Sequence, residues 1–458
     1  MFGSEIKSFL AHPKFHKAVN HNALRPYLTL QFSATDETFF EGVYKLPAAH
    51  CFTYDLATHT MDVRRYWDCD FSEIDKPFEE YVDELDEVVH ESVSAHRIAD
   101  VKVGSFLSGG VDSSYIAACL MPDKTFSVGF DYKNFNETNY AAELSDKLGI
   151  ENYRKMISAD EFFEALPEIQ YHMDEPQSNL SSVPLWFLAQ MAAEQVTVVL
   201  SGEGADEIFG GYAWYEDNPS VAKYKRMVPF GVRRALGKAA KHMPYFKGHN
   251  FLMKGAEMAE EYFVGQALVW PEREVSSVLR PEYDKGEGAF ELAAPIYARV
   301  SDKSELIRKQ YLDMNMWLPG DILLKADKMC MAHSLELRVP FLDRRVMEFA
   351  EHIPDRYRVN ENGNKLVLRH AANKSLPDEW ATRPKVGFPV PMIYWLREEK
   401  WYNWVKEYFT APWASEFFDC DVLMGLLDEH YEGKAQNQRK IYTPLVFLIW
   451  YKRYFIDE

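Results

Sequence analysis

The stretch that decides the fold is Ser108-Gly109-Gly110-Val111-Asp112-Ser113-Ser114. It lies where an apolar run, 101–107, gives way to a helical pattern over 115–120. Glycines let backbone N–H groups approach an anion, serine hydroxyls add donors, and the following helix points the positive end of its dipole at the charge. The stretch predicts a phosphate-binding turn between a strand and a helix, with Asp112 available to hold Mg²⁺. It lacks the lysine and the spacing of a GxxxxGK[ST] loop, and the alternative is an ordinary Ser/Gly turn.

Length and composition indicate a globular protein with more than one core. The chain has 458 residues, of which 47% are hydrophobic and 15% aromatic, so two or three packed units are expected. A net charge of -19 would repel a phosphate backbone and argues against a nucleic-acid partner. No apolar run reaches the 18–20 or so residues that cross a bilayer, so no membrane partner is expected. Five scattered cysteines form no metal or disulfide pattern, which favours a cytoplasmic location.

Short β-branched runs alternate with helical segments from about residue 100 to 212. Strands are expected at 101–107, 125–130, 152–157 and 196–200, and helices at 113–120, 137–148 and 160–172. This alternation predicts an α/β fold with a parallel sheet. Ligands bind beyond the carboxyl ends of the strands in such sheets, so the turns at 108–114 and 201–207 are expected to face one ligand.

The two flanking regions have a different character. Residues 1–66 contain strand-like pieces at 28–32 and 50–54 and are expected to form a separate domain. Residues 223–241 are helical and rich in Lys and Arg, which we interpret as a solvated amphipathic surface rather than a membrane or partner site.

Three carboxylates, Glu203, Asp206 and Glu207, crowd the second turn. Like charges this close raise each other's proton affinity unless a cation or hydrogen bonds relieve them. The cluster therefore suits either Mg²⁺ binding or a general base that accepts a proton from an attacking amine. The alternative is a helix N-terminus, where acidic residues are favoured in any case.

Two further segments carry charged residues. Lys385 lies in a loop, 383–391, that three prolines stiffen. It could neutralise charge that develops on a phosphate, and the alternative is a surface lysine. In the run 321–328, charges lie among apolar residues, and we interpret them as ion pairs that position helices. The fourteen histidines show no metal or catalytic spacing.

Taken in order, these motifs resemble one family. SFLSGGVDSS, FSVGF followed by Glu137, MDEP at 173–176, LSGEGADEIFGGY, LLKADKMCMAHSLELRVPFLD and KVGFPVP occur as they do in glutamine-hydrolysing asparagine synthetases. The resemblance implies an ATP pyrophosphatase sheet of the adenine nucleotide alpha hydrolase type, surrounded by helices, over residues 67–458. It also implies that ATP adenylates the side-chain carboxylate of L-aspartate, releasing pyrophosphate, and that ammonia then displaces AMP to form L-asparagine.

The same resemblance assigns roles position by position. Glu203 would help to form the intermediate and handle the ammonia proton, and Lys385 would stabilise the adenylation transition state. Glu203, Asp206 and Glu207 would face the substrate. The nucleotide and its Mg²⁺ would be held as follows: Leu107 and Val128 near the adenine through their backbone, Ser201 and Gly202 on the nucleotide, Ser108, Gly109, Gly110, Asp112, Ser113 and Ser114 on the pyrophosphate, and Asp112 on the metal.

The chain departs from this family at its start. Family members begin with a cysteine nucleophile of a glutaminase domain, whereas this sequence begins Met1-Phe2-Gly3. Residues 1–66 resemble the closing part of that domain, a β-rich remnant, so we expect no glutamine hydrolysis by this polypeptide. The candidate protein partners are a separate glutaminase subunit and a second copy of the chain in a homodimer.

Two alternatives stay open. The enzyme could amidate another carboxylate, such as that of a cell-surface sugar or a secondary metabolite, because residue types alone do not fix the width of the substrate pocket. It could also be an inactive assembly partner, although Ser108, Asp112, Glu203 and Lys385 are all present.

Overall fold

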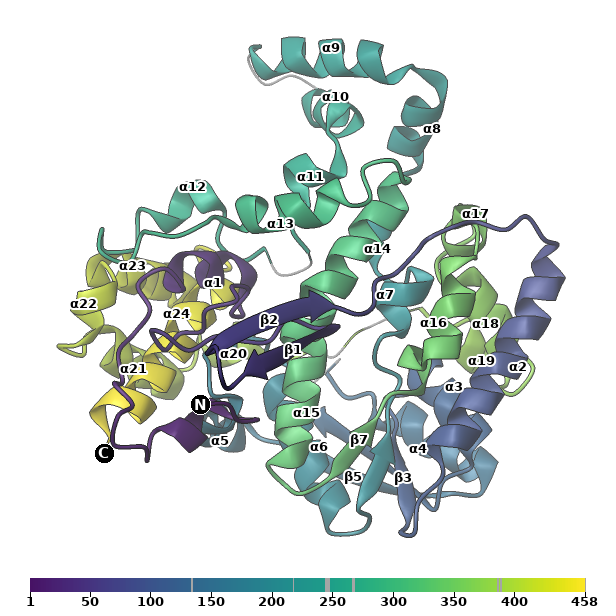
Figure 1. Ribbon diagram of the computed structural model, residues 1–458, viewed down its shortest axis with the longest axis horizontal. Helices are drawn as coiled ribbons and strands as arrows, with labels where there is room; N and C mark the ends of the chain where they lie inside the picture. Colours follow the sequence, from purple (N-terminus) through teal and green to yellow (C-terminus); the bar gives the residue numbers. More distant parts are fainter. Residues whose placement is uncertain are drawn as a thin grey trace.

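A five-stranded parallel sheet lies between helices in the lower part of Figure 1. The computed structural model describes residues 1–132, 135–216, 218–243, 248–265, 268–384, 387 and 389–457. The expected α/β class is confirmed, because every strand pair in this sheet is parallel. The strands lie in the order β5 (Glu151–Ile157), β4 (Lys124–Phe130), β3 (Val103–Phe106), β6 (Val198–Leu200) and β7 (Glu336–Arg338).

The four strands expected from the sequence are present, with ends shifted by no more than two residues. The fifth, β7, is absent from the sequence prediction. Its three residues, Glu-Leu-Arg, offer no apolar run, and the strand forms only by pairing with β6.

Helices cover both faces of the sheet, and the alternation of side chains along each strand fixes which core a residue joins. Val199 of β6 lies in one core, and its neighbours Val198 and Leu200 lie in the other. The helices of the first core include α5 (Ala159–Met173), α6 (Ser182–Ala193), α15 (Leu324–Met331) and α24 (Gln438–Tyr451). Those of the second include α2 (Phe78–His96), α3 (Val111–Leu120), α4 (Thr138–Leu148), α7 (Ala205–Phe209), α16 (Arg344–Glu351) and α18 (Leu366–Ala372).

The strand expected at 28–32 is wrong. The chain instead forms a helix there, α1 (Leu24–Leu30), which ends at Gln31 in the left-handed conformation with φ of 62°. Six of its seven residues are buried, so the segment shows no polar face from which a helical period could be recognised.

Residues near α1 share a core with the C-terminal helix α24. Phe39 is fully buried and contacts the rings of Phe447 and Trp450, with centroids 6.0 and 5.4 Å apart. The Tyr27 hydroxyl donates a hydrogen bond of 2.9 Å to the Thr443 carbonyl. Part of the N-terminal region therefore packs into the first core, together with α24.

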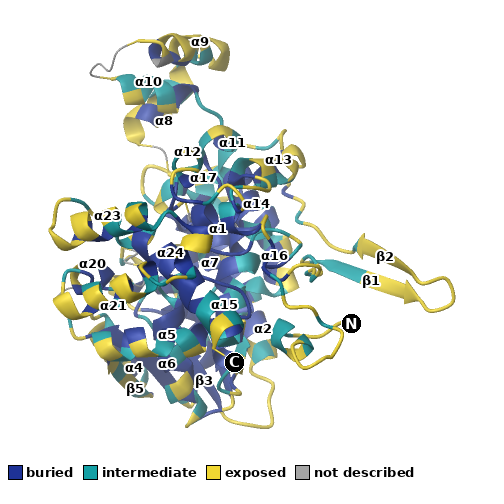
Figure 2. Ribbon diagram, turned by 90° about the vertical axis from the view of Figure 1, so that its left-hand side faces the viewer, coloured by how far each residue is buried: buried dark blue, intermediate teal, exposed yellow. Residues whose placement is uncertain are grey.

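Two features extend from this body (Figure 2). The antiparallel hairpin of β1 (His50–Asp55) and β2 (Thr60–Arg65) is largely exposed and confirms the strand expected at 50–54. The helices α8 (Pro219–Met227), α9 (Phe230–Lys241) and α10 (His249–Ala256) form the second projection. Within the described part of the chain, no helix combines the length and apolar character that crossing a membrane requires.

Replacement of Phe39 by Ala tests the shared core. Removal of a fully buried ring should cost about 3–5 kcal/mol, because both transfer energy and packing are lost. We expect a lower midpoint of urea unfolding. Phe52→Ala, on the hairpin where this ring is 41% exposed, should change it little. Equal shifts for the two variants would contradict a shared core.

Candidate functional site

Two turns at the carboxyl edge of the sheet meet in one cavity. One turn joins β3 to α3 and the other joins β6 to α7, and β3 and β6 are hydrogen-bonded neighbours. A Cβ on Gly202 would lie only 2.8 Å from the Ser113 nitrogen, so glycine is needed for this close approach. The cavity has a volume of about 1160 Å³. The expectation that the two turns face one ligand site is thus matched by the geometry.

The first turn is held in shape by its own hydroxyls. The Ser108 nitrogen donates to the Ser113 hydroxyl at 3.1 Å, and the Gly110 nitrogen donates to the Ser108 hydroxyl at 3.3 Å. Gly110 is the N-cap of α3 and has no side chain to cap the first turn of the helix. The N–H groups at this helix end are therefore oriented for an anion such as a phosphate.

Most of the site residues expected from the sequence line the cavity: Leu107, Ser108, Gly110, Asp112, Ser113, Val128, Ser201, Gly202, Glu203 and Asp206. Three lie behind its wall instead. Gly109 is buried, Ser114 is fully buried, and Glu207, 1% exposed, accepts a 2.6 Å hydrogen bond from the Tyr212 hydroxyl. Lys385 lies outside the described residues.

The backbone of Leu107 is already engaged. Its N–H donates to the Phe126 carbonyl at 2.9 Å, and its carbonyl accepts from the Ser127 hydroxyl at 2.8 Å. An adenine contact at this position would have to use the remaining lone pair of the carbonyl or the side chain.

A lysine that the sequence analysis missed joins the two turns. The Nζ of Lys365 lies 2.7 Å from both carboxylate oxygens of Asp112 and 2.6 Å from Oδ1 of Asp206. Burial alone would lower the pKa of Lys365, but the two carboxylates outweigh it and raise the pKa, so the side chain is charged. Lys365 follows an Asn/Gly-rich turn with no periodic pattern, so no feature of the sequence marks it as a site residue.

Glycine also makes room for this bridge. A Cβ on Gly211 would lie 1.9 Å from Cε of Lys365 and 2.0 Å from Oδ1 of Asp206. Any residue with a Cβ would therefore displace Lys365 or Asp206.

The carboxylates of Asp112 and Asp206 suit a metal ion that binds together with a substrate. Among the described residues, no group of three or more His, Cys, Asp or Glu side chains could hold a metal ion. Asp112 and Asp206 nevertheless converge on one point, where Lys365 Nζ lies. Mg²⁺ is commonly bound by one or two carboxylates together with phosphate oxygens of a substrate. The two carboxylates fit that pattern.

Arginine adds positive charge beside the first turn. Arg383 donates to the Gly109 carbonyl at 3.2 Å and to Oε1 of Glu137 at 3.0 Å. Burial raises the pKa of Glu137, and Arg383 opposes this rise. The side chains of Glu137 and Arg383 both line the cavity, so the sequence signals at these two residues belong to the site.

A buried polar layer supports the second turn. The carboxyl group of Asp313, on α14 (Glu305–Asn315), accepts a 2.6 Å hydrogen bond from the Tyr215 hydroxyl. Burial raises the pKa of Asp313 to about 8. Trp214, next to Tyr215, lines the cavity, so Asp313 acts on the site through the segment it holds.

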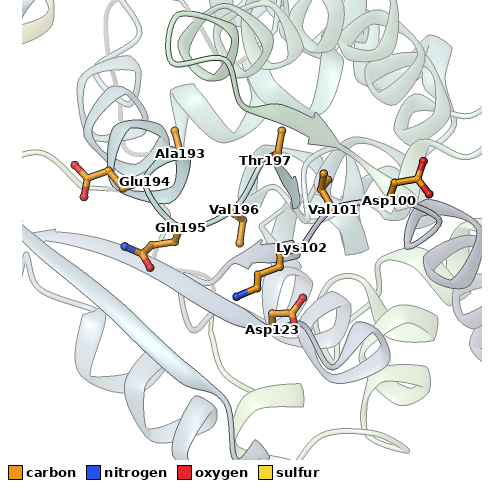
Figure 3. A pocket seen from close by; sticks show the side chains of 10 residues that line it. Asp100, Val101, Lys102, Asp123, Ala193, Glu194, Gln195, Val196 and Thr197 are labelled. Atoms are coloured by element: carbon orange, nitrogen blue, oxygen red, sulfur yellow. The ribbon is translucent and has the colours of Figure 1, made fainter.

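A second hollow opens at the opposite, amino edge of the sheet (Figure 3). Its wall includes Lys102, just before β3, Asp123, just before β4, and Glu194, before β6. Neither the 108–114 turn nor the 201–207 turn contributes to its wall, and ligands of parallel sheets bind at the carboxyl edge. The candidate site is therefore the cavity at the carboxyl edge.

Comparison with known proteins agrees with this geometry. Residues 84–452 match the asparagine synthase family, and residues 1–67 match a glutamine amidotransferase domain. The chain is 37% identical over 467 residues to asparagine synthetase (glutamine-hydrolyzing) 1 of Bacillus subtilis, covering 100% of this chain and 73% of that protein. It is 37% identical over 450 residues to a putative asparagine synthetase (glutamine-hydrolyzing) of Mycobacterium tuberculosis H37Rv, covering 95% and 68%. It is also 25% identical over 442 residues to amidase chry2 of Gibberella zeae, covering 86% and 65%.

The raised pKa of Asp313 predicts how stability depends on pH. The neutral carboxyl is favoured in the folded state, so its contribution is complete below about pH 4 and is lost as the pH rises through about 8. Asp313→Asn keeps a neutral group of similar shape. We expect its thermal unfolding midpoint to fall less than that of the wild type between pH 5 and 8, and parallel curves for the two proteins would contradict the assignment.

Proposed function

Since the chain belongs to the asparagine synthase family and is a carbon–nitrogen ligase, we propose that it amidates L-aspartate to L-asparagine with ATP. The observation that carries the proposal is the convergence of the 108–114 and 201–207 turns on one cavity, with Asp112 and Asp206 bridged by Lys365. ATP is the nucleotide of this family, and an anion-binding helix end facing carboxylates suits a nucleotide with its metal.

The proposed reaction has two steps. A side-chain carboxylate oxygen of aspartate attacks the α-phosphorus of ATP, and the bond to the β-phosphate breaks to release pyrophosphate. The nitrogen of ammonia then attacks the acyl carbon, AMP leaves with the bonding electrons, and the nitrogen loses a proton. β-Aspartyl-AMP links the two steps.

Each group of residues has a role in this scheme. The N-terminus of α3, with Ser108 and Ser113, would bind the leaving pyrophosphate. Mg²⁺, when bound with ATP, would neutralise phosphate charge, and Asp112 and Asp206 would hold it. Glu203 lines the cavity and would accept the proton from the attacking nitrogen. Lys385 remains a proposed stabiliser of the adenylation transition state.

We propose ammonia, free or delivered by a separate glutaminase subunit, as the nitrogen donor. A thiol that attacks glutamine needs a lowered pKa. Burial raises the pKa of Cys69 to about 12 and also raises the pKa of three further thiols, those of Cys119, Cys330 and Cys420. The remaining cysteine, Cys51, is on the hairpin and does not line the cavity.

The same proposal covers the two units of the chain, its location in the cell and its assembly. Residues 1–66 would be the glutaminase-like unit and residues 67–458 the synthetase unit. The five cysteines are free thiols, which supports a cytoplasmic location. A second copy of the chain remains a candidate partner.

A second candidate is amidation of a larger acid. The cavity volume, about 1160 Å³, is above the usual 300–1,000 Å³ of pockets for one ligand, and this cavity would hold ATP as well as the acid.

The test is release of AMP and pyrophosphate by the purified chain with ATP, Mg²⁺ and ammonium, with and without L-aspartate. We expect aspartate-dependent release and formation of asparagine, and no asparagine when glutamine replaces ammonium. Glu203→Gln should slow the reaction by about 10²-fold or more, because proton transfer is lost. The matched control is Glu194→Gln, at the amino-edge hollow, which should leave the rate unchanged. If the release of AMP and pyrophosphate depends on another acid and not on aspartate, the second candidate is favoured.

A further inference from the structure

Lys325 is a buried cation in the wall of the cavity. It lies on α15, only 4% exposed. Among the residues that the structure describes, its ammonium group makes no hydrogen bond and no ion pair. Taking a charge out of water is costly unless an opposite charge or hydrogen bonds compensate it. The position of Lys325 therefore suggests that a bound anion balances the charge of its ammonium group.

Asp321 and Asp327 are the two acids nearest to Lys325 in sequence. Asp321, one helical turn earlier, is completely buried; burial raises its pKa to about 6, and the charge of Lys325 opposes this rise. Its Oδ1 accepts from the Gln177 amide at 2.7 Å, and its Oδ2 accepts from the amides of Gln31 and Asn179, both at 3.0 Å. The ion pairing expected for 321–328 holds for Lys328, which lies 2.8 Å from Asp174, but not for Lys325.

Two further donors in the cavity wall also lack partners. The Tyr442 hydroxyl and the Trp317 indole N–H are buried, with side chains 1% and 3% exposed, and neither has a hydrogen-bond partner among the described residues. Arg439 lines the same cavity and donates to Oε1 of Gln31 at 3.1 Å. Thus a buried ammonium, a guanidinium, a hydroxyl and an indole N–H line the cavity; we call Lys325, Arg439, Tyr442 and Trp317 the donor group.

The donor group lies on other elements than the turns at 108–114 and 201–207. Lys325 and Trp317 flank the π-helical turn Leu318–Leu323, and Arg439 and Tyr442 are on α24. Gln31 ties these elements together, because it donates to Asp321 and accepts from Arg439. The cavity therefore has one wall built for phosphate and another rich in donors and positive charge.

We propose that the donor group binds the second, non-reacting carboxylate of the acid substrate, with Lys325 as its main partner. The inference rests on the proposed function, because it places the reacting carboxylate at the nucleotide. A carboxylate accepts several hydrogen bonds at once and carries a charge opposite to that of Lys325. The site therefore selects dicarboxylic acids over acids with one carboxylate.

Kinetics with two substrates test this selection. Aspartate and 3-aminopropanoate differ only in the carboxylate that the donor group would bind. Lys325→Met should raise the KM for aspartate at least about 30-fold, as expected for loss of a buried charge partner, while the KM for ATP stays within about twofold. The preference for aspartate over 3-aminopropanoate should shrink by the same factor, and Lys325→Arg should keep part of it. Lys400→Met, at an exposed lysine, is the control.

A binding measurement separates this inference from the proposed function. Aspartate or succinate should raise the thermal unfolding midpoint of the wild type, and propionate should not. Lys325→Met should lose the shift with dicarboxylates but keep the shift with ATP, which also shows that the variant is folded. An unchanged dicarboxylate shift, or an unchanged KM for aspartate in a folded variant, would overturn the role of Lys325. Absence of asparagine formation by a wild type that still shows the dicarboxylate shift would overturn only the proposed function.

Discussion

The ion bridge from Asp112 through Lys365 to Asp206 is the interaction on which the site depends. Two carboxylates from different turns would repel each other at this distance, and a single buried ammonium holds both. The bridge forms only because glycine at 202 and 211 lets backbone and side chains approach closely. It therefore sets the distance between the phosphate-type turn and the acidic turn, and hence the shape of the nucleotide end of the cavity.

The N-terminal region is tied to the same cavity by the MDEP segment. The Asp174 carboxylate accepts from the backbone N–H groups of Ile6 and Lys7 at 3.0 and 3.2 Å. Burial would raise the pKa of Asp174, but Lys328 and Lys7 outweigh it and lower the pKa. Glu175 accepts from the Phe39 N–H at 2.9 Å. The region that matches an amidotransferase domain thus contacts the segment that continues into the cavity wall.

The sheet and both turns could be predicted because their signals are local. Apolar runs mark the strands, and glycines with carboxylates mark the turns at 108–114 and 201–207. The residues that complete the site could not be predicted in the same way. Lys365 meets Asp112 across 253 positions of sequence, and Lys325 differs from its ion-paired neighbour Lys328 only in what surrounds it. Such long-range contacts depend on packing, as does the helix α1, whose apolar residues the sequence analysis assigned to a strand.

The most direct test of this account is the rate of aspartate-dependent pyrophosphate release by Lys365→Gln. The account predicts a loss of roughly 10²-fold or more, because the two carboxylates lose their shared partner and the preorganised charges of the site move. Lys374→Gln, which removes an exposed lysine paired with Asp83, should keep the wild-type rate. A wild-type rate for a folded Lys365→Gln would contradict the claim that this bridge organises the site.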